Sequence, residues 1–279
     1  MKSTTKIVLG ILIVVFSLSI IFIAYVASRY DSNYPDHGKV VNHQIPQGNM
    51  EAPDLPPFKV ACLTVDPDAS VQKWNWVGGT IFLKPSGTGD KGNKLSFSEN
   101  ISSFVSYNVE GDTLIIKLKH GDIYNAYRGS EGSGYIFVHG VDINLAIDSD
   151  IEVISNIPQF GVTAEDIAVN EATISANNAE IKVLSSKIGV LNIVNPQNGS
   201  KQHALIERSE IGTYNLDLDN LYGWRVSESK IGVENLTGGG QHDIQQSKQE
   251  STVVNWIPKS KDASLKVQLF GDTVSIKFQ

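Results

Sequence analysis

Three segments in the second half of the chain repeat one short pattern, and this repetition restricts the fold more than any other feature. The segments are Ser186–Ile193, Ser209–Leu216 and Ser229–Leu236, and each carries Ile-Gly near its start and Asn next to its end. They recur about every 20 to 23 residues, which is the length of one coil of a β-solenoid. We therefore expect the segments to stack on one another and not to form separate folds.

Apolar and polar residues alternate almost continuously between positions 135 and 257. Alternation with a period of two places the apolar residues on one face of a strand. The residues that we expect in a shared interior are Val141, Ile143, Leu145, Ile147, Val153, Ile167, Val169, Ile174, Ile181, Val183, Ile188, Leu191, Ile193, Leu205, Ile211, Leu216, Leu218, Leu221, Val226, Ile231, Val233, Leu236, Ile244, Val253 and Val254.

Glycine and asparagine recur in phase with the repeats. Gly189, Gly212 and Gly232 each follow the repeated Ile, and we expect them at sharp bends where the backbone needs freedom in φ. The repeated asparagines, Asn192, Asn215 and Asn235, fit either a hydrogen-bonded ladder at a turn or simple outward-facing polar positions.

The residues before and after the repeats also predict β structure, and the helical signal is almost absent after Phe58. Glu110-Gly111-Asp112 is a tight-turn sequence, and Gly271-Asp272 is another, between Ser264–Phe270 and Thr273–Phe278. We expect both hairpins to cover strand edges at the ends of the stack. The strands expected near the N-terminal end are Phe58–Val65, Thr80–Leu83, Lys94–Ser98, Phe104–Val109 and Thr113–Lys119.

The N-terminus contains an uncharged apolar segment, Ile7–Ala27, which is long enough to cross a bilayer as a helix. Lys2 and Lys6 precede it, so the positive-inside rule places the N-terminus in the cytoplasm and the bulk of the chain outside. A cleaved signal peptide is the alternative, with Val26-Ala27-Ser28 as a moderate cleavage site.

The expected domain boundaries follow from these features. Residues 1–29 form the cytoplasmic tip and transmembrane anchor, and residues 30–57, which contain five prolines, form an extended linker. Residues 58–279 form an all-β domain, with N-terminal strands over 58–134 and the C-terminal hairpin over 264–278. Cys62 is the single cysteine, so no internal disulfide can form, and its expected role is that of a small buried residue in a strand over Val60–Val65.

Two motifs within this β domain resemble a known family. Val109–Ile116 and Gly140–Leu145, followed by serial Ser-rich β coils, resemble the head GIN domain family of auto-transporter adhesins, envelope proteins of Bacteroidetes-type bacteria. The resemblance covers roughly residues 58–278 and implies a right-handed parallel β-solenoid in the periplasm or at the cell surface. With the apolar segment, it implies a single-pass protein of the bacterial inner membrane. The chain departs from the family at the N-terminus, because those proteins commonly begin with a cleaved or lipoprotein signal.

Charge and motif content exclude several functions. The net charge is -7 and Lys and Arg are scattered, which argues against nucleic-acid binding. No phosphate-binding loop or nucleophile motif occurs. We expect no cofactor and no metal, since the six histidines lack metal-ligand spacing: His37, His43, His120, His139, His203 and His242.

Acidic residues provide the candidates for catalysis. Asp217 and Asp219 are two positions apart and share a strand face, where they could bind Ca²⁺ or act as acid and base. Asp148, Asp150 and Glu152 form a similar row. The alternative is that all five are solvated carboxylates, and we predict no catalytic residue because no basic partner accompanies them.

A pair of tryptophans is the candidate for binding through aromatic rings. Trp74 and Trp76 also share a strand face, so their rings could stack on a sugar or pack against a protein. The alternative is that they plug the end of the stack.

Taken together, the sequence predicts a non-catalytic binding or adhesion-like envelope module that is anchored in the inner membrane and contacts a protein or glycan partner. A carbohydrate-active β-solenoid enzyme that uses the acidic residues is one alternative. An envelope signalling component is another, and it would require a membrane partner.

Overall fold

The structure is a computed structural model that describes residues 19, 41–66, 76–87, 92–127, 136–194, 201–246 and 251–269. The chain forms two compact units, Met1–Val41 with Ser130–Ile136, and Asn42–Gly129 with Phe137–Gln279. The first unit contains only residues 19, 41 and 136 among those described. The strands and helices below belong to the second unit, and β1 and β8 each begin at its boundary.

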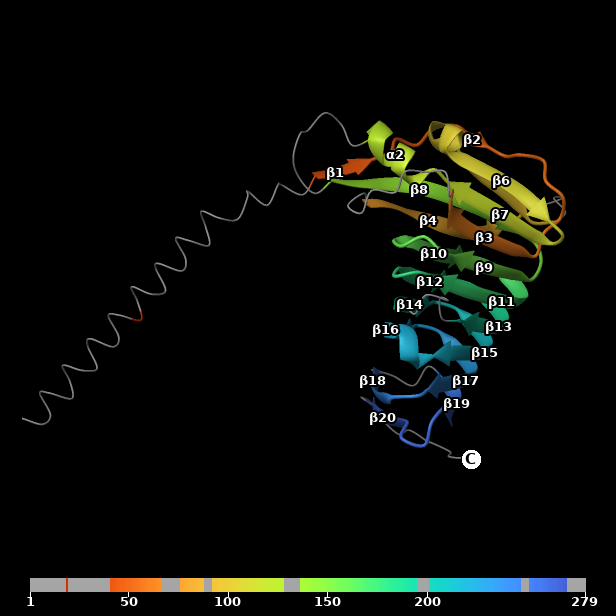
Figure 1. Ribbon diagram of the computed structural model, residues 1–279. Helices are drawn as coiled ribbons and strands as arrows, with labels where there is room; N and C mark the ends of the chain where they lie inside the picture. Colours follow the sequence, from red (N-terminus) through yellow and green to blue (C-terminus); the bar gives the residue numbers. More distant parts are fainter. Residues whose placement is uncertain are drawn as a thin grey trace, which may run out of the picture. The chain divides into compact units, whose positions relative to one another are not determined.

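The second unit is mostly β and contains two nine-stranded sheets (Figure 1). Sheet A has the order β16-β14-β12-β10-β4-β8-β5-β2, with β1 also paired to β8, and sheet B has the order β19-β17-β15-β13-β11-β9-β3-β7-β6. Sheet A consists of β1 (Val41–Gln44), β2 (Met50–Glu51), β4 (Trp76–Pro85), β5 (Lys94–Ser98), β8 (Ile136–Ile147), β10 (Phe160–Glu165), β12 (Glu180–Leu184), β14 (Gln202–Glu207) and β16 (Leu221–Ser227). Sheet B consists of β3 (Val60–Val65), β6 (Val105–Glu110), β7 (Thr113–Leu118), β9 (Ile151–Ser155), β11 (Ala168–Ala176), β13 (Lys187–Ile193), β15 (Glu210–Asp217), β17 (Lys230–Gly238) and β19 (Ser251–Pro258).

From β9 to β17 the chain passes alternately through sheet B and sheet A, and each strand pairs in parallel with the next strand of its own sheet. The three sequence repeats are β13, β15 and β17, and their isoleucines Ile188, Ile211 and Ile231 are register partners. The prediction that the repeats stack is therefore confirmed. Both sheets are mixed, because β2–β5, β5–β8 and β6–β7 pair antiparallel.

The core lies between the two sheets and follows the predicted alternation. The predicted residues that are buried are Val141, Ile143, Leu145, Ile147, Val153, Ile167, Ile174, Ile181, Val183, Ile188, Leu191, Ile193, Ile211, Leu216, Leu218, Ile231 and Leu236. Leu205 is an exception, because its neighbours Ala204 and Ile206 occupy the inward positions of β14. Val169, Leu221, Val226, Val233 and Val254 are only half-buried and Val253 is exposed, while the side chain of Ile244 is not described.

The repeated asparagines form a hydrogen-bonded ladder. The Nδ2 group of Asn215 donates to Oδ1 of Asn192 at 2.7 Å, and Asn235 donates to Asn215 at 2.7 Å. Asn255 extends the ladder by donating to Asn235 at 2.8 Å, and Asn192 donates to Thr173 Oγ1 at 3.0 Å. The ladder runs along the middle of the sheet B strands and not along a turn, so its expected location was wrong.

Serine hydroxyls and left-handed residues form the corners before β13, β15 and β17. The residues Ser185, Arg208 and Glu228 have φ of 49°, 50° and 51°. Each is followed by a serine, and Ser209 Oγ accepts the Ser186 N–H while Ser229 Oγ accepts the Ser209 N–H, both at 3.1 Å. The hydroxyl group of each repeated serine therefore forms a hydrogen bond to the backbone of the preceding corner.

The repeated glycines have a different role from the one expected. Gly189, Gly212 and Gly232 lie within strands, and none of them has a positive φ. A Cβ atom on Gly212 would lie 2.6 Å from the carbonyl oxygen of Gly189, and one on Gly232 would lie 2.6 Å from that of Gly212. Glycine is needed because neighbouring backbones approach closely, not because φ must be free.

Substitution of Gly212 by alanine should destabilise the protein, because the new methyl group meets a backbone atom that cannot rotate away. We expect the free energy of unfolding to fall by about 1–3 kcal/mol in urea denaturation. Gly223→Ala in β16 is the control, because no atom lies within 4 Å of its Cβ position. Equal stabilities for the two variants would contradict this packing.

A hairpin and two short helices lie at the N-terminal end of the sheets (Figure 1). The predicted hairpin is confirmed, because β6 and β7 pair antiparallel around Gly111, whose φ is 65°. The 3-10 helix η1 (Glu99–Phe104) and the helix α2 (His120–Tyr127) were not predicted. Helix α2 has only eight residues, too short for a periodic signal, and it buries Ile123 and Tyr124.

Part of the predicted linker belongs to the folded unit. Residues 30–57 were expected to be extended, but β1 pairs with β8 and β2 pairs with β5. Ile45 is 1% exposed and its N–H donates to the His139 carbonyl, and Asn100 Nδ2 donates to the Pro46 carbonyl at 2.8 Å. The many prolines of this segment suggested an extended linker, so the burial of Ile45 was not predicted.

At the C-terminal end, β20 (Ser264–Leu269) pairs in parallel with β18 (Gln241–Gln246). The turn and returning strand of the predicted second hairpin lie outside the described residues. Apart from Ser19, the predicted membrane anchor Ile7–Ala27 also lies outside them. No helix in the described part of the chain is both long and apolar enough to span a membrane.

Candidate functional site

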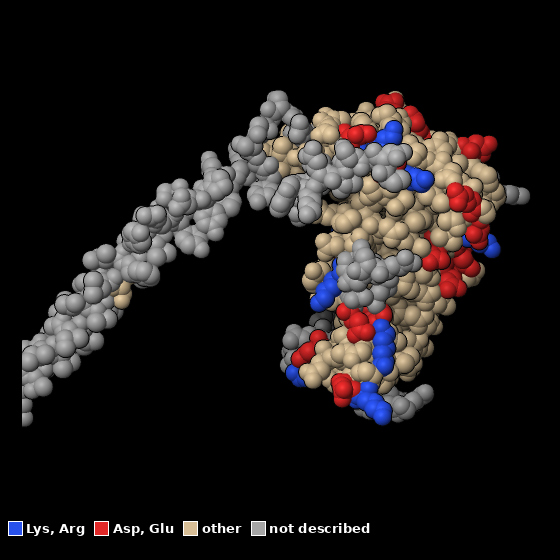
Figure 2. Space-filling view, viewed as in Figure 1, with Lys and Arg blue, Asp and Glu red and all other residues tan. Residues whose placement is uncertain are grey.

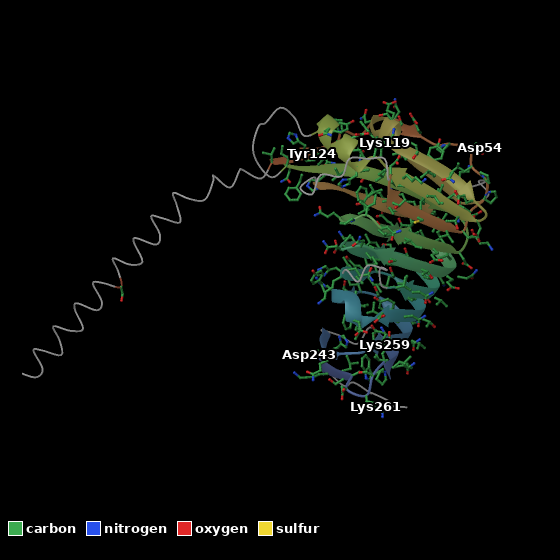
Figure 3. The ribbon with its side chains drawn as sticks, viewed as in Figure 1. Asp54, Lys119, Tyr124, Asp243, Lys259 and Lys261 are labelled. Atoms are coloured by element: carbon green, nitrogen blue, oxygen red, sulfur yellow. The ribbon has the colours of Figure 1, made fainter. Side chains whose placement is uncertain are left out.

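The predicted acidic pair lies near the C-terminal end of the described sheets, where Figure 3 places Lys259. Asp217 ends β15, and Asp219 follows in the 3-10 helix η2 (Leu218–Asn220). His242 comes from β18, and Lys259 directly follows β19. The last coils thus bring together four side chains of which the sequence identified only two.

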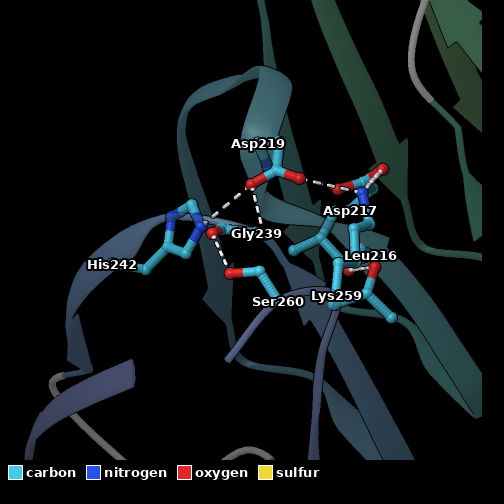
Figure 4. Close-up of polar contacts among 8 residues, drawn as sticks. Leu216, Asp217, Asp219, Gly239, His242, Lys259 and Ser260 are labelled. Carbon is cyan, nitrogen blue, oxygen red and sulfur yellow. Dashed lines mark hydrogen bonds and ion pairs between the residues drawn. The ribbon is translucent and has the colours of Figure 1, made fainter. Parts of the chain in front are cut away.

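These side chains form one polar network, the Asp219 cluster, defined as Asp217, Asp219, His242 and Lys259 (Figure 4). Lys259 Nζ donates to Asp217 and, at 2.9 Å, to Asp219 Oδ2. Asp219 Oδ1 accepts the Gly239 N–H at 2.7 Å and lies 3.2 Å from His242 Nε2. The Lys259 ammonium therefore neutralises part of the charge of both carboxylates, and the prediction that no basic residue accompanies this pair was wrong.

The protonation state of Asp219 argues against a role as a general acid. Burial acts to raise the pKa of Asp219, but the Gly239 N–H, Lys259 and His242 outweigh it and hold that pKa at about 2. Burial acts to lower the pKa of Lys259, and the two aspartates reverse this effect and raise it. A general acid must hold a proton near the working pH, which Asp219 does not. The Asp219 cluster instead fastens η2, Gly239 and the residue after β19 to one another.

This role predicts a pH-dependent contribution to stability. The folded pKa of Asp219 lies below the unfolded value of about 3.9, so its stabilisation is complete above pH 4 and is lost as the pH falls towards 2. Asp219→Asn should lower the free energy of unfolding by about 1 kcal/mol at pH 7 and have almost no effect at pH 2. Denaturation at a series of pH values measures this difference.

Asp243→Asn is the matched control, because Asp243 makes a single exposed ion pair with Lys266 at 3.0 Å. We expect its effect to stay within about 0.5 kcal/mol at every pH. A pH-independent effect of Asp219→Asn would contradict the role of the ionised carboxylate.

The three residues of the second acidic row have different surroundings. Asp148 Oδ2 accepts the Gly92 N–H at 2.7 Å, and Asp150 Oδ1 accepts the Glu171 N–H at 2.8 Å. Glu152 lies in β9 opposite Thr173. Asp148 and Asp150 thus bond to separate backbone segments. Within the described residues, no group of three or more His, Cys, Asp or Glu side chains could hold a metal ion.

The predicted tryptophan pair is only partly described. Trp74 lies outside the described residues, and for Trp76 only the backbone is described. That backbone begins β4 in register with Phe137 of β8. Whether the two indoles share a face stays a prediction.

One further titratable pair is buried between the sheets. Glu234 of β17 is fully buried and is the register partner of Tyr214, which is also buried. Burial, and then the nearby Glu234 carboxylate, raises the pKa of Tyr214 well above its ordinary value. Both groups are enclosed in the core, so we assign them no role in binding.

Sequence reasoning missed two adjoining hollows on the outer face of sheet A, which together we call the sheet A groove. The first has a volume of about 370 Å³ and the second about 360 Å³. They share Gly79, Thr80 and Gln159. The first is also lined by Gly161, Thr163, Asn178, Ala179, Glu180 and Lys182, and the second by Gln44, Gly78, His139, Gly140 and Asp142.

The charged side chains that line the groove are Lys182, Glu180 and Asp142. Lys182 Nζ lies 2.9 Å from Glu180 Oε2. Burial raises the pKa of Asp142, and a backbone hydrogen bond from Thr80 and the charge of Lys84 partly oppose that rise. The His139 ring stacks on Phe137 with the ring centroids 6.0 Å apart. In the space-filling view of Figure 2, acidic and basic residues are interspersed and no broad basic patch is visible.

Comparisons with known proteins show only distant similarity. No protein-family model and no curated protein matches the chain. A proposed adhesin from Bacteroides fragilis NCTC 9343 has a similar structure, with 11% identity and a TM-score of 0.40 over 85% of this chain and 99% of that chain. A proposed lipid-binding protein from Parabacteroides distasonis ATCC 8503 has 11% identity and a TM-score of 0.36 over 86% of this chain and 100% of that chain.

A proposed adhesin from Parabacteroides merdae ATCC 43184 has 9% identity and a TM-score of 0.28 over 87% of this chain and 100% of that chain. Similarities at this level carry no argument about what the chain binds, so its function must be inferred from its own residues.

Proposed function

We propose that this chain is a non-catalytic binding module of the bacterial envelope, with adhesion-like behaviour and the sheet A groove as its binding face. The observation that carries the proposal is the separation of the groove's two carboxylates. Asp142 lies on β8 and Glu180 on β12, three strands away in the order β8-β4-β10-β12. Three steps of about 4.8 Å give about 14 Å, whereas paired glycosidase carboxylates lie about 5–9.5 Å apart.

The arrangement of the strands supports the finer fold that we propose, a right-handed parallel β-solenoid. The alternation of strands between two sheets and their in-register parallel pairing are what such a winding requires. The proposed fold agrees with the resemblance to the head GIN domain family. A sheet face suits a binding surface, because the hydrogen bonds between its strands hold the side chains in position before the partner arrives.

We further propose that Ile7–Ala27 anchors the protein in the inner membrane and that residues 30–40 form a short linker. The second compact unit, which we call the β unit, would then lie outside the cytoplasm. Protease treatment of spheroplasts tests this arrangement. The β unit should be digested or released only from outside, and the N-terminal peptide should stay with the membrane. Protection of the β unit in intact spheroplasts would contradict it.

The test of non-catalytic binding uses the full chain in detergent. We expect immobilised chain to retain one class of envelope glycan or protein saturably and to release no cleavage product from envelope polysaccharides. Two variants remove one carboxylate each: Asp142→Asn in the sheet A groove and Asp219→Asn in the Asp219 cluster. Product release that either variant abolishes would show an enzyme and overturn the proposal.

A further inference from the structure

We propose that the sheet A groove binds an uncharged oligosaccharide laid across the strands of the sheet. This inference rests on the proposed binding function and names the chemical class of its partner.

The floor of the groove is fixed by the register of β4 and β10. Thr80 is the register partner of Gly161, and Phe82 is the partner of Thr163. Gly161 lies at an outward position and carries no side chain, and a Cβ atom there would lie 2.7 Å from the Glu180 carbonyl oxygen. The outer face of the sheet is therefore lower at Gly161 than at its neighbours, which leaves room for a ligand.

The walls of the groove offer both donors and acceptors, as sugar hydroxyls require. Gln159 and Asn178 have φ of 67° and 48° and occupy corresponding turns before β10 and β12. Amides and threonine hydroxyls donate and accept, and the Asp142 carboxylate accepts. The volume of each hollow lies at the lower end of the range found for small-ligand sites.

The charges of the lining residues favour an uncharged sugar over an acidic one. Lys182 is the single Lys or Arg among the described lining residues, and its ammonium is paired with Glu180. Asp142 adds a second carboxylate. An acidic polysaccharide would meet two carboxylates and no unpaired lysine or arginine within the hollow, which costs binding energy.

Stacked rings flank the groove on both sides. His139 and Phe137 lie on β8, and at the far side the His203 ring stacks on Tyr222 with centroids 5.2 Å apart. His203 is the register partner of Glu180, and Tyr222 is 61% exposed. From β8 to β16 there are five strand steps, or about 24 Å, a length that suits an oligosaccharide chain. A protein partner would need a wider apolar centre than these glycines and threonines provide.

The test measures binding of the full chain in detergent to an array of neutral and acidic oligosaccharides, followed by calorimetry with the strongest neutral ligand. Thr163→Arg places a long side chain over the floor and should weaken binding at least tenfold. Tyr222→Ala should weaken it about threefold to tenfold, since an aromatic stack contributes about 0.5–1.5 kcal/mol. The controls, Thr213→Arg and Tyr107→Ala on strands of sheet B, should bind as the wild type does, and circular dichroism melts check that each variant is folded.

The outcomes separate this inference from the proposed function. Binding only of acidic glycans, or equal weakening by Thr163→Arg and Thr213→Arg, would overturn the inference and leave a binding module. Retention of an envelope protein through the groove, without any glycan, would do the same. Retention of neither a glycan nor an envelope protein would overturn both proposals.

Discussion

Replacement of Gly79 by alanine is expected to lower the free energy of unfolding by about 3 kcal/mol, the upper end of the usual cost of overpacking. The new Cβ would lie 1.9 Å from the Val141 carbonyl oxygen and 2.7 Å from Phe160 Cε1. The oxygen belongs to a buried strand backbone, so relief requires that β4 and β8 move apart. Urea denaturation followed by circular dichroism measures the loss.

Gly223→Ala is again the control, since it adds the same methyl group to a sheet A strand where no atom lies within 4 Å. We expect its stability to change by less than about 0.5 kcal/mol. If Gly79→Ala were as stable as this control, the pairing of β4 with β8 at Gly79 would be wrong, and with it the second hollow of the sheet A groove, which residues of both strands line.

Leu191→Ala should cost about 2–5 kcal/mol, because it leaves a cavity between the two sheets. Leu191 is fully buried in β13 and lies in register between Ala172 of β11 and Tyr214 of β15. Its neighbours belong to separate coils and cannot all close in on the gap. The same denaturation experiment measures this effect.

Leu205→Ala is the matched control, because this leucine faces outward from β14 and is only half-buried. We expect the free energy of unfolding to fall by less than about 1 kcal/mol, because the Leu205 side chain buries little apolar area on folding. Similar losses for Leu191→Ala and Leu205→Ala would mean that the inward and outward faces of the strands are assigned incorrectly.

Features fixed by neighbouring residues could be predicted from the sequence. The β6–β7 hairpin depends on Gly111, which takes a φ of 65° that most residues avoid, so its turn was visible in the sequence. The stacking of β13, β15 and β17 depends on a spacing and an alternation that are both local. The strand Lys94–Ser98 has the predicted bounds for the same reason.

Features fixed by register between distant segments could not be predicted. The floor of the groove combines Thr80 with Gly161, and their alignment depends on the turns between the strands. The role of Gly212 depends on the distance to the Gly189 backbone, whereas its sequence context indicated a bend. Both the alignment of Thr80 with Gly161 and the need for glycine at position 212 depend on contacts between strands that are distant in the sequence.

The candidate acidic site was predicted only in part. The two-residue spacing of Asp217 and Asp219 predicted a shared strand face, which was wrong because Asp219 lies in η2. The two carboxylates meet at Lys259 instead. Lys259, which determines their chemistry, comes 40 residues after Asp219, and His242 comes 23 residues after it. No local pattern connects these positions, so the sequence left open a general-acid role for Asp219 that its low pKa argues against.

The most direct test of the stacked, in-register strands is disulfide formation across the asparagine ladder. In a Cys62→Ser background, the pair Asn192→Cys and Asn215→Cys joins adjacent strands, whose Cα atoms should lie about 5 Å apart, within the range that disulfides span. The pair Asn192→Cys and Asn235→Cys spans two strand steps, about 10 Å, which a disulfide cannot bridge. We expect rapid, complete oxidation of the folded protein for the first pair and free thiols for the second. Free thiols in the first pair, or a disulfide in the second, would contradict the parallel stacking of these coils.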